Sequence, residues 1–384
     1  MMAQTNRERI LKTFAHKKVD KLVFSPRLYY WYLWNKLYLR PQKPKKYHHA
    51  KIPPQYLGRS QLQIYDYLEA SPRYTFESLY LPLIWPRIQI RKGFYIAQKK
   101  GPRPGEVCTY YKTPIGTLRK VRSASSSGSG HLIEYPIKTV KDIPVMKYIL
   151  NHTKFHFLWP FYKIAEKRLG DRGVPSTYFL HSPYMKLIID YMGFSNTIIN
   201  LRRHKDKMED FIRFMEEWDD HMFEALARSP LKIINFGENI DANLSSPPYF
   251  EKYLLPYYER RVKQLHRAGK YCHIHMDGSL KTLLPYLSTL PFDGLEALTP
   301  EPQGDISLEE LREAIGDKIL LDGLPSVLFL PEYSLSYVKN FTKKLLELFS
   351  PNLIVGISDE FPPNGDMRKL EIIGDMLKDF NPYD

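Results

Sequence analysis

Short apolar runs alternate with longer amphipathic segments beyond about residue 142 of the chain. The apolar runs have the length and composition of buried strands, and they are STYFLHSP, LKIINFGEN, GKYCHIHMDG, DGLEALTP, DKILLDGLP and NLIVGISDE. The amphipathic segments predict helices at 185–191, 207–227, 250–268, 280–290, 308–315 and 337–349. Because a strand, helix, strand order requires crossover connections, these strands are predicted to be parallel.

The N-terminal part adds two further strand-like runs. An amphipathic helix is predicted within residues 1–18, followed by the apolar run KLVFSP at 21–26, and a second β-like run covers residues 74–80. Together with the later strands these make eight βα units, which favour a TIM (β/α)8 barrel in the α/β class. A doubly wound open sheet is the alternative, but the GxGxxG turn that would support it is absent from the sequence. We expect a single domain spanning residues 1–384.

Between about residues 88 and 121 the pattern changes to alternating apolar and polar positions. The segments RIQIRKGFYIAQ and EVCTYYKTPIGTLRKV are joined by GPRPGE, and a proline-glycine loop between two such segments predicts an antiparallel hairpin. We therefore expect a hairpin insertion at about residues 83–135. The run SSSGSG at 125–130 predicts a flexible loop, which is either a connector or, beside a pocket, a lid.

The composition is that of a globular protein with an unusual charge. Apolar residues make up 43% and charged residues 26% of the chain, which excludes global disorder, but the formal net charge is +14. Such a charge is typical of proteins that bind nucleic acid, an anionic substrate or an acidic protein. The densest basic run, LRPQKPKKYHHAK at 39–51, has no signature of a nucleic-acid-binding fold. We interpret it first as a solvated loop and second as a docking surface, and we expect no nucleic-acid partner.

Two features bear on the cellular compartment. Only Cys108 and Cys272 are present, too few for a disulfide framework and without CxxC spacing, which indicates a reducing environment. The N-terminal helix lacks the apolar core of a signal peptide, and no later segment contains 18 consecutive apolar residues. We expect a cytoplasmic protein without a membrane partner.

The stretch YCHIHMDGS at residues 271–279 carries the densest candidate chemistry. In a strand, alternation places His273, His275 and Asp277 on one face and apolar side chains on the other. Gly278 supplies an exit turn, so His275 and Asp277 are predicted at the carboxyl end of a strand, where α/β enzymes keep their chemistry. Imidazole and carboxylate ligands at this spacing suit a borderline cation such as zinc. The alternative is that hydrogen bonds alone satisfy these side chains.

The other predicted strand ends are also rich in polar residues. In a barrel, one mouth would collect His181, Glu238, Asn239, His275, Asp277, Glu296, Asp322, Ser358, Asp359 and Glu360. We interpret Asp322 and Asn243 as turn formers, since Asp and Asn are favoured in turns for local hydrogen bonds. Glu238 directly follows Gly237 at a strand end, and general acid, ligand orienter and buried ion-pair partner all remain open for it. The aromatic stretch LYYWYLWNKLY at 28–38 covers either the core or a substrate pocket.

Several blocks of the sequence resemble the uroporphyrinogen decarboxylase superfamily. They are RERILKTFAHKKVDKLVFSP at 7–26, TPIGTL at 113–118, the long block at 234–325 and the terminal SDEFPPNGD. The resemblance covers nearly the whole chain and implies a TIM barrel, in agreement with the strand count. The superfamily comprises cofactor-free porphyrinogen decarboxylases and zinc-dependent methyltransferases that exchange methyl groups with a corrinoid or a thiol.

Two motifs favour the methyltransferase branch. The decarboxylases carry an arginine-rich segment that grips substrate carboxylates, whereas SPRLYYWYL at this place keeps only Arg27. The methyltransferases carry a His-x-Cys pair, which His275-x-Asp277 resembles with an oxygen in place of the sulfur ligand. An oxygen ligand leaves zinc more Lewis-acidic and less thiophilic than a sulfur ligand does. This departure therefore indicates that the zinc polarises an oxygen of the substrate rather than activating a thiol. The resemblance further implies Glu296 and Asp359 as the later metal ligands.

The function implied is a zinc-dependent methyltransferase that moves the methyl group of a small O-methylated substrate to a corrinoid (cobalamin) carried by a partner protein. We assign catalytic roles to Glu238, Asn239 and Arg27, and substrate contacts to Tyr30, Trp31, His181 and His273. The alternative is a cofactor-independent decarboxylase or lyase in which Glu238, His275 and Arg27 handle protons and a carboxylate. A third hypothesis, a barrel without catalysis whose basic face binds a partner, predicts neither a metal nor a shaped pocket. The sequence leaves the oligomeric state open.

Overall fold

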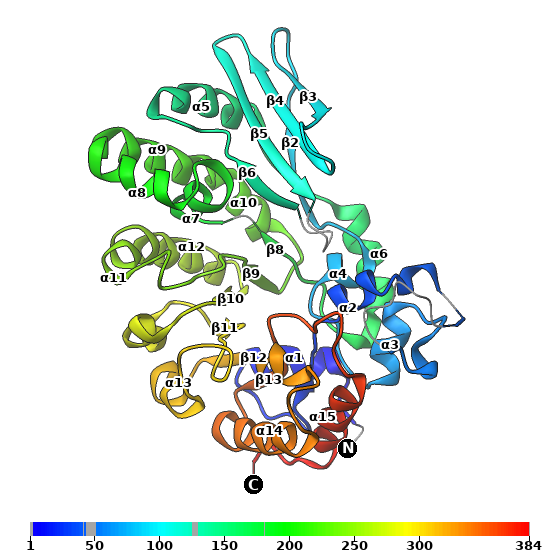
Figure 1. Ribbon diagram of the computed structural model, residues 1–384. Coiled ribbons are helices and arrows are strands. Elements are labelled where there is room, and N and C mark those ends of the chain that lie inside the picture. Colours follow the sequence, from blue (N-terminus) through cyan, green and yellow to red (C-terminus); the bar gives the residue numbers. More distant parts are fainter. Residues whose placement is uncertain (1–2, 41, 44–50, 125–129, 180, 384) are drawn as a thin grey trace. The chain divides into compact units, whose positions relative to one another are not determined.

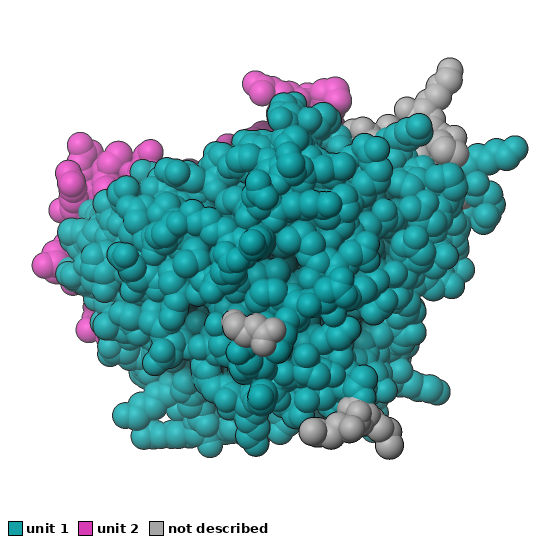
Figure 2. All heavy atoms as spheres, turned by 90° about the horizontal axis from the view of Figure 1, so that it is seen from below, with its two compact units in different colours: residues 1–83, 158–179, 230–384 teal, residues 84–157, 180–229 magenta. Residues whose placement is uncertain are grey.

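The computed structural model describes residues 3–40, 42–43, 51–124, 130–179 and 181–383 of the chain (Figure 1). The chain forms two compact units, which are coloured separately in Figure 2. Unit 1 comprises residues 1–83, 158–179 and 230–384, and unit 2 comprises residues 84–157 and 180–229. Most of the SSSGSG run and residues 44–50 of the basic run lie outside the described residues.

Unit 1 is built around a seven-stranded sheet of order β1-β13-β12-β11-β10-β9-β8. Every pair of neighbouring strands in it is parallel. The strands are β1 (Val23–Phe24), β8 (Tyr178–Phe179), β9 (Ile233–Phe236), β10 (Tyr271–His275), β11 (Gly294–Glu296), β12 (Ile319–Pro325) and β13 (Leu353–Ser358). The predicted α/β class with a parallel sheet is therefore confirmed, and each apolar run predicted beyond residue 142 contributes one strand.

Helices α12, α13 and α14 lie outside strands β9 to β13 (Figure 1). The α-helices of unit 1 are α1 (Asn6–Phe14), α2 (Tyr29–Trp34), α3 (Gln61–Tyr67), α4 (Thr75–Leu79), α6 (Trp159–Leu169), α11 (Pro247–Tyr249), α12 (Leu255–Arg267), α13 (Leu308–Ile315), α14 (Leu335–Phe349) and α15 (Met367–Asp379). A π-helical segment (Phe250–Leu254) leads into α12, and a 3-10 helix (Lys281–Thr289) precedes β11. Capping boxes begin α1 and α13, where a Ser or Thr and a Glu three residues later satisfy backbone N–H groups. In the part of the chain that the structure describes, no helix is long and apolar enough to cross a membrane.

The prediction of a strand at residues 74–80 is wrong, because α4 occupies this stretch as a short helix. Short runs of mixed apolar and polar residues fit both periodicities, so tertiary contacts decide between them. The segment just before α4 is the one that meets the sheet. The backbone N–H of Ser71 donates to the carbonyl of Phe24 at 2.7 Å, and that of Thr75 donates to the carbonyl of Ser176 at 3.1 Å. Residues 71–75 thus contact β1 on one side and the residues leading into β8 on the other.

Apolar side chains fill the interior at the amino ends of the strands. Helix α1 contributes Ile10 and Phe14 to a cluster whose other members are Val23, Val174, Ile233, Ile319, Leu321 and Ile354. A cavity of about 30 Å³ is lined by most of these residues, though not by Val23 or Ile319, together with Arg73 and His273. Burying a side chain of this size contributes about 1.5–3 kcal/mol. The amino ends are therefore devoted to stability, which leaves the carboxyl ends of the strands for polar residues.

Unit 2 combines antiparallel strands with helices. Its four-stranded sheet has the order β3 (Tyr95–Lys100), β4 (Glu106–Thr113), β5 (Gly116–Ala124) and β6 (Gly130–Glu134), and GPRPGE joins the first two strands. A separate antiparallel pair consists of β2 (Ile84–Ile88) and β7 (Thr153–Phe157). The α-helices are α5 (Ile143–Asn151), α7 (Pro183–Lys186), α8 (Phe194–Arg203), α9 (Lys205–Trp218) and α10 (Asp220–Arg228).

The single helix predicted at 207–227 is two helices, α9 and α10, which meet at Asp219. The Asp219 carboxylate is buried and accepts a hydrogen bond from the Lys186 ammonium at 2.6 Å. A buried charge needs such a partner. Helical periodicity could not predict this ion pair, because the pair joins two segments that are separate in the sequence.

Candidate functional site

The carboxyl ends of the strands in unit 1 bring the candidate residues together. His275 is the last residue of β10 and Glu296 the last of β11, and the two are register partners in the sheet. Asp277 follows β10 by two residues, and Asp359 directly follows β13. Arg27 lies just beyond β1. Because parallel strands end at the same edge of a sheet, side chains as far apart in sequence as Arg27 and Asp359 meet there.

Gly278 lies where two loops approach each other closely. A Cβ atom built on Gly278 would lie 2.3 Å from Oδ2 of Asp241, so a larger residue would force this loop to move. The Asp241 side chain accepts a hydrogen bond from the backbone N–H of Asn243 at 2.7 Å, which places Asn243 in a turn as predicted. The glycine after β10 is therefore explained by close packing of the two loops.

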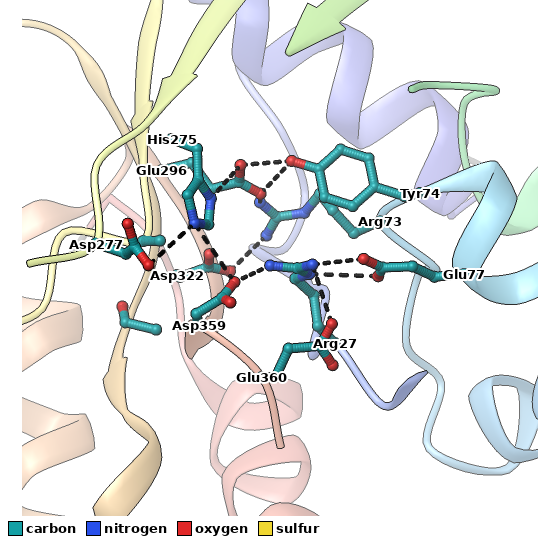
Figure 3. Close-up of polar contacts among 12 residues, drawn as sticks. Arg27, Arg73, Tyr74, Glu77, His275, Asp277, Glu296, Asp322, Asp359 and Glu360 are labelled. Carbon is teal, nitrogen blue, oxygen red and sulfur yellow. Dashed lines mark hydrogen bonds and ion pairs between the residues drawn. The ribbon is translucent and has the colours of Figure 1, made fainter. Parts of the chain in front are cut away.

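The two ring nitrogens of His275 face different partners (Figure 3). Nδ1 lies 3.2 Å from Oε2 of Glu296, whereas Nε2 lies 3.8 Å from Oδ2 of Asp277 and 3.8 Å from Oδ1 of Asp359. His275, Asp277 and Asp359 each offer a ligand atom, and these atoms lie within 4.8 Å of one another. Burial lowers the pKa of His275, but hydrogen bonds with Asp277 and Glu296 outweigh it and raise the pKa to about 9. The side chains of Asp277 and Asp359 are each 34% exposed, so this group faces solvent.

Glu296 is fully buried, and other side chains occupy both of its oxygens. Oε1 accepts hydrogen bonds from Arg73 Nη1 at 2.9 Å and from the Tyr74 hydroxyl at 2.5 Å. Oε2 accepts one from Asn235 Nδ2 at 2.6 Å and faces the imidazole of His275. Burial works to raise the pKa of Glu296, but His275 and the nearby Arg73 hold it well below its usual range. The structure thus places Glu296 behind the imidazole and outside the group of ligand atoms.

His273 lies deeper in the same interior. Its Nδ1 is 3.0 Å from Asn235 Nδ2, which donates to it, so Nδ1 acts as an acceptor. Burial lowers the pKa of His273 to about 4, so the imidazole is neutral at physiological pH. The predicted shared face of His273 and His275 is confirmed by the contacts that both make with Glu296. His273 is buried, and its contacts with Asn235 and Glu296 help to order these two residues.

Arg73 connects two buried carboxylates. Its Nη1 donates to Glu296 and its Nη2 donates to Oδ1 of Asp322 at 2.8 Å. The interpretation of Asp322 as a turn former is wrong, because Asp322 lies within β12 with its side chain fully buried. Its φ of 86° is in the left-handed region, which a non-glycine residue adopts only when the surroundings enforce it. Burial raises the pKa of Asp322 to about 7.

Arg27 is surrounded by three carboxylates. Its guanidinium donates to both oxygens of Glu77, through Nε and Nη2, to Oδ1 of Asp359 through Nη1, and to Glu360 through Nη2 at 3.0 Å. The guanidinium also lies 5.2 Å from the centre of the Tyr74 ring. Burial raises the pKa of Glu360 to about 8, although Arg27 opposes this effect.

We use the term carboxylate cluster for the charged members of this network. It contains two guanidiniums, Arg27 and Arg73, and the carboxyl groups of Glu77, Asp277, Glu296, Asp322, Asp359 and Glu360. Carboxyl groups outnumber the guanidiniums, and most of them are buried. Such an excess is costly in a low-dielectric interior unless protons or a further cation offset it.

The remaining predicted residues differ in their exposure and surroundings. Glu238 is buried two residues after the end of β9, and Asn239 is exposed with a left-handed φ of 52°. Tyr30 is 38% exposed, and its backbone N–H lies 3.4 Å from a Glu360 oxygen. Trp31 is fully buried, with edge-to-face contacts to Tyr56 and Phe361, and is a core residue in this structure. His181 belongs to unit 2, where its Nδ1 lies 2.9 Å from Oδ2 of Asp190.

Four members of the network were absent from the sequence-based prediction: Arg73, Tyr74, Glu77 and Asn235. Arg73, Tyr74 and Glu77 lie in or beside the segment that was predicted to be a strand. That prediction did not indicate that all three side chains point toward the network. Asn235 lies within a buried apolar run, IINF. A polar amide in a strand buried on both faces requires buried partners, and that signal could have identified Asn235.

Comparison with known families adds a finding to this geometry. The sequence profile of the family described as Uroporphyrinogen decarboxylase (URO-D) matches residues 120–380. The chain belongs to the uroporphyrinogen decarboxylase family. The matched region of this family member includes His275, Glu296 and Asp359, whereas Arg27 and Arg73 precede it. No curated protein sequence matches the chain.

Two solved structures are similar to the chain along most of its length. A methyltransferase from Methanosarcina mazei is similar with a TM-score of 0.62 and 14% identity, over 98% of this chain and 99% of that one. A B12-independent methionine synthase from Shewanella sp. W3-18-1, in complex with selenomethionine, has a TM-score of 0.44 and 12% identity, over 93% of this chain and 98% of that one. At these identities the similarity to the Methanosarcina protein concerns the fold alone.

Proposed function

We propose that the protein is a zinc-dependent methyltransferase that moves the methyl group of a small O-methylated substrate to a corrinoid carried by a partner protein. The observation that carries this proposal is the group of His275, Asp277 and Asp359, with Glu296 behind the imidazole. Metal-binding histidines typically donate their second ring N–H to a carboxylate, which fixes the ring and leaves the other nitrogen for the metal. The methyltransferase motif that His275 and Asp277 resemble supports the same assignment.

The donor set fits zinc. One imidazole nitrogen and two carboxylate oxygens are ligands that zinc accepts, and catalytic zinc sites commonly use three protein ligands. The excess of carboxyl groups in the carboxylate cluster favours a divalent cation over a neutral ligand. We therefore propose His275, Asp277 and Asp359 as the ligands. Glu296, first expected as a ligand, is proposed instead to orient His275, because its oxygens are occupied by Arg73, Tyr74 and Asn235.

Bound zinc would act as a Lewis acid toward the methylated oxygen of the substrate, and carboxylate ligands would make it a stronger acid than thiolates would. The chain itself supplies the positioning. Glu296 and Arg73 hold His275 in one orientation, and Glu77 holds Arg27 beside Asp359. We propose that Glu238 and Asn239, at the end of the neighbouring strand β9, assist proton transfer to the departing oxygen. Tyr30 supplies exposed aromatic surface for the substrate.

We further propose that unit 1 is a TIM barrel and that residues 71–75 occupy the place of the eighth strand. The hydrogen bonds of this segment to Phe24 and Ser176 support this arrangement. The sheet of unit 2 would then be an insertion in the barrel, and residues 1–384 one functional domain. Both free cysteines are buried, and we propose that the enzyme works in the reducing cytoplasm.

The experiment combines metal analysis with methyl transfer. Elemental analysis of the purified protein is expected to find close to one zinc per chain. Methyl transfer from methoxylated compounds to a cobalt(I) corrinoid is expected to stop on chelation and to return with zinc. Asp277→Cys is expected to keep the metal but to slow ether demethylation, because thiolate donates more charge to the zinc. Methyl transfer that survives complete removal of zinc would refute the proposal.

The same assay tests the decarboxylase alternative. That reaction needs Arg27 to hold a substrate carboxylate, but the Arg27 guanidinium already contacts Glu77, Asp359 and Glu360. A decarboxylase would turn over carboxylated substrates after chelation, and Arg27→Ala would cost about 2 kcal/mol or more of transition-state stabilisation. Metal-independent release of carbon dioxide would therefore favour the alternative.

A further inference from the structure

Arg27 and the proposed metal site share one atom. The oxygen of Asp359 that accepts from Arg27 Nη1 is Oδ1, and the same Oδ1 lies 3.8 Å from Nε2 of His275. The Asp359 oxygen nearest to Nε2 of His275 is therefore the one that Arg27 already holds. A metal ion at this oxygen would compete with the Nη1–H of Arg27 for the same lone pairs, and the two cations would repel each other.

The guanidinium is anchored on its other side. Nε and Nη2 of Arg27 contact the two oxygens of Glu77 in a bidentate pair, and Nη2 also contacts Glu360. Bidentate pairs of this kind are among the strongest and most directional in proteins. The Glu77 side chain is 5% exposed, whereas that of Asp359 is 34% exposed. Asp359 is thus the partner that can move, while Arg27 stays with Glu77.

We propose that Arg27 and the metal ion compete for Asp359, and that metal binding leaves Nη1 of Arg27 directed at the substrate. This inference rests on the proposed function, because it requires a metal held by His275, Asp277 and Asp359. A buried guanidinium donor that has lost a carboxylate needs another acceptor. The substrate therefore carries an anionic oxygen, such as a carboxylate, beside its methylated oxygen. Arg27 therefore lowers the affinity of the site for the metal. It can bind the anionic oxygen of the substrate only after the metal has displaced it from Asp359.

The first experiment measures zinc affinity by calorimetric titration of chelator-treated protein. The variants are Arg27→Lys, which keeps the charge but lacks Nη1, and Arg27→Met, which removes both. Arg9→Lys is the matched control, because Arg9 pairs with Asp20, which is not part of the carboxylate cluster. Arg27→Lys is expected to bind zinc about tenfold tighter than the unaltered protein, because the hydrogen bond from Nη1 no longer competes with the metal. Arg27→Met is expected to bind zinc tighter still, because the positive charge is lost as well. Arg9→Lys is expected to bind zinc as the unaltered protein does.

The lysine variant separates competition from a general effect of charge. If Arg27 acts only through its positive charge, Arg27→Lys will bind zinc like the unaltered protein, and the competition is overturned. Weaker binding in Arg27→Lys overturns it as well, since Arg27 would then support Asp359 as a ligand. If the unaltered protein and every variant fail to bind zinc, both this inference and the proposed function fall. In the first two outcomes the unaltered protein still binds zinc, so the competition is refuted but the proposed function is not.

A crystal structure of the unaltered protein with zinc is the second measurement and does not depend on the folding of any variant. The contact between Arg27 Nη1 and Asp359 Oδ1 is expected to be broken, while both contacts to Glu77 persist. An intact contact to Asp359 in the zinc-loaded protein would overturn the competition.

The anionic substrate is tested with two small methyl ethers, methoxyacetate and the neutral 2-methoxyethanol. Zinc-loaded unaltered protein is expected to bind methoxyacetate at least about tenfold tighter, because a charge-assisted hydrogen bond to Arg27 is gained. In zinc-loaded Arg27→Met this preference is expected to fall by about the same factor. Equal affinities in the unaltered protein, or a preference that Arg27→Met retains in full, would overturn the assignment of an anionic substrate.

Discussion

At each end of strand β10 lies a group of side chains of the types that can bind a metal ion. At the carboxyl end are His275, Asp277 and Asp359, and at the amino end are His266, Cys272 and Asp293. In both groups the ligand atoms lie within 4.8 Å of one another, and Cys272 would even supply the softer donor that zinc often prefers. Proximity and ligand type therefore do not distinguish the two ends.

The amino-end group is already satisfied by the fold. Oδ2 of Asp293 accepts a hydrogen bond from the backbone N–H of Cys272 at 2.6 Å and lies 2.9 Å from Nε2 of His266. Asp293 also joins β10 to β12 through backbone hydrogen bonds to Cys272 and Ile319. The carboxylate thus completes the hydrogen bonding of the strands.

The carboxyl-end group differs in what surrounds it. Glu296 occupies Nδ1 of His275, so that Nε2 remains directed at Asp277 and Asp359. The neighbouring carboxyl groups outnumber the guanidiniums. The metal site that we propose is therefore supported less by the three nearest donors than by Glu296, which orients His275, and by an excess of carboxyl groups that a bound cation would help to offset.

Removing the histidine at each end is expected to give the largest contrast. His275→Ala should lower zinc affinity by more than about a hundredfold, since loss of an outer partner alone costs 10–100-fold. His266→Ala should retain zinc and methyl transfer, because hydrogen bonds within the fold already occupy the Asp293 carboxylate. Elemental analysis and zinc titration of both variants check this expectation. Zinc lost from His266→Ala and kept by His275→Ala would reverse the comparison.

The second layer is tested by the carboxylates. Glu296→Gln should lower zinc affinity by about 10–100-fold, because the amide is a weaker acceptor for the Nδ1–H of His275. Asp293→Asn, the matched change at the other end, should leave zinc binding unchanged and lower the free energy of unfolding by about 1 kcal/mol through weakened hydrogen bonds. Zinc titration and urea unfolding of both variants separate the two roles. Equal zinc affinities in Glu296→Gln and the unaltered protein would remove Glu296 from the site.

The smallest expected effect concerns the thiol. Burial, aided by Asp293, raises the pKa of Cys272 well above 9. The unfolded chain ionises this thiol at its ordinary pKa while the folded chain keeps the proton. The free energy of unfolding should therefore fall as the pH rises above about 9, by up to about 1.4 kcal/mol per pH unit.

Cys272→Ala should lack this contribution, so the measurement is the difference in urea stability between the two proteins from pH 7 to pH 10. Added zinc should not change it. If zinc instead formed the thiolate near neutral pH and stabilised the protein there, the amino end would be a metal site after all.

Local sequence patterns determined much of this protein. The alternation in YCHIHMDG placed His273 and His275 on one face, and the strand, helix, strand order predicted every parallel strand beyond residue 142. Family blocks and the His-x-Asp spacing pointed to the strand end at which His275, Asp277 and Asp359 lie together. These properties depend on residues that are close together in the sequence, so they can be predicted from periodicity and motif spacing.

Other features were decided only by the tertiary structure. Arg73 reaches Glu296 across 223 residues of sequence, and Tyr74 reaches it across 222. Asp322, a plausible turn former by residue type, became a buried ion-pair partner because Arg73 lies opposite it. Whether Glu296 lies among the candidate ligand atoms or behind the His275 ring depends on which donors occupy its oxygens. The sequence determined which residues stand at the strand ends, but the pairing of the strands and the packing of the loops beyond them determined which of these residues touch, because those contacts join segments that are far apart in the sequence.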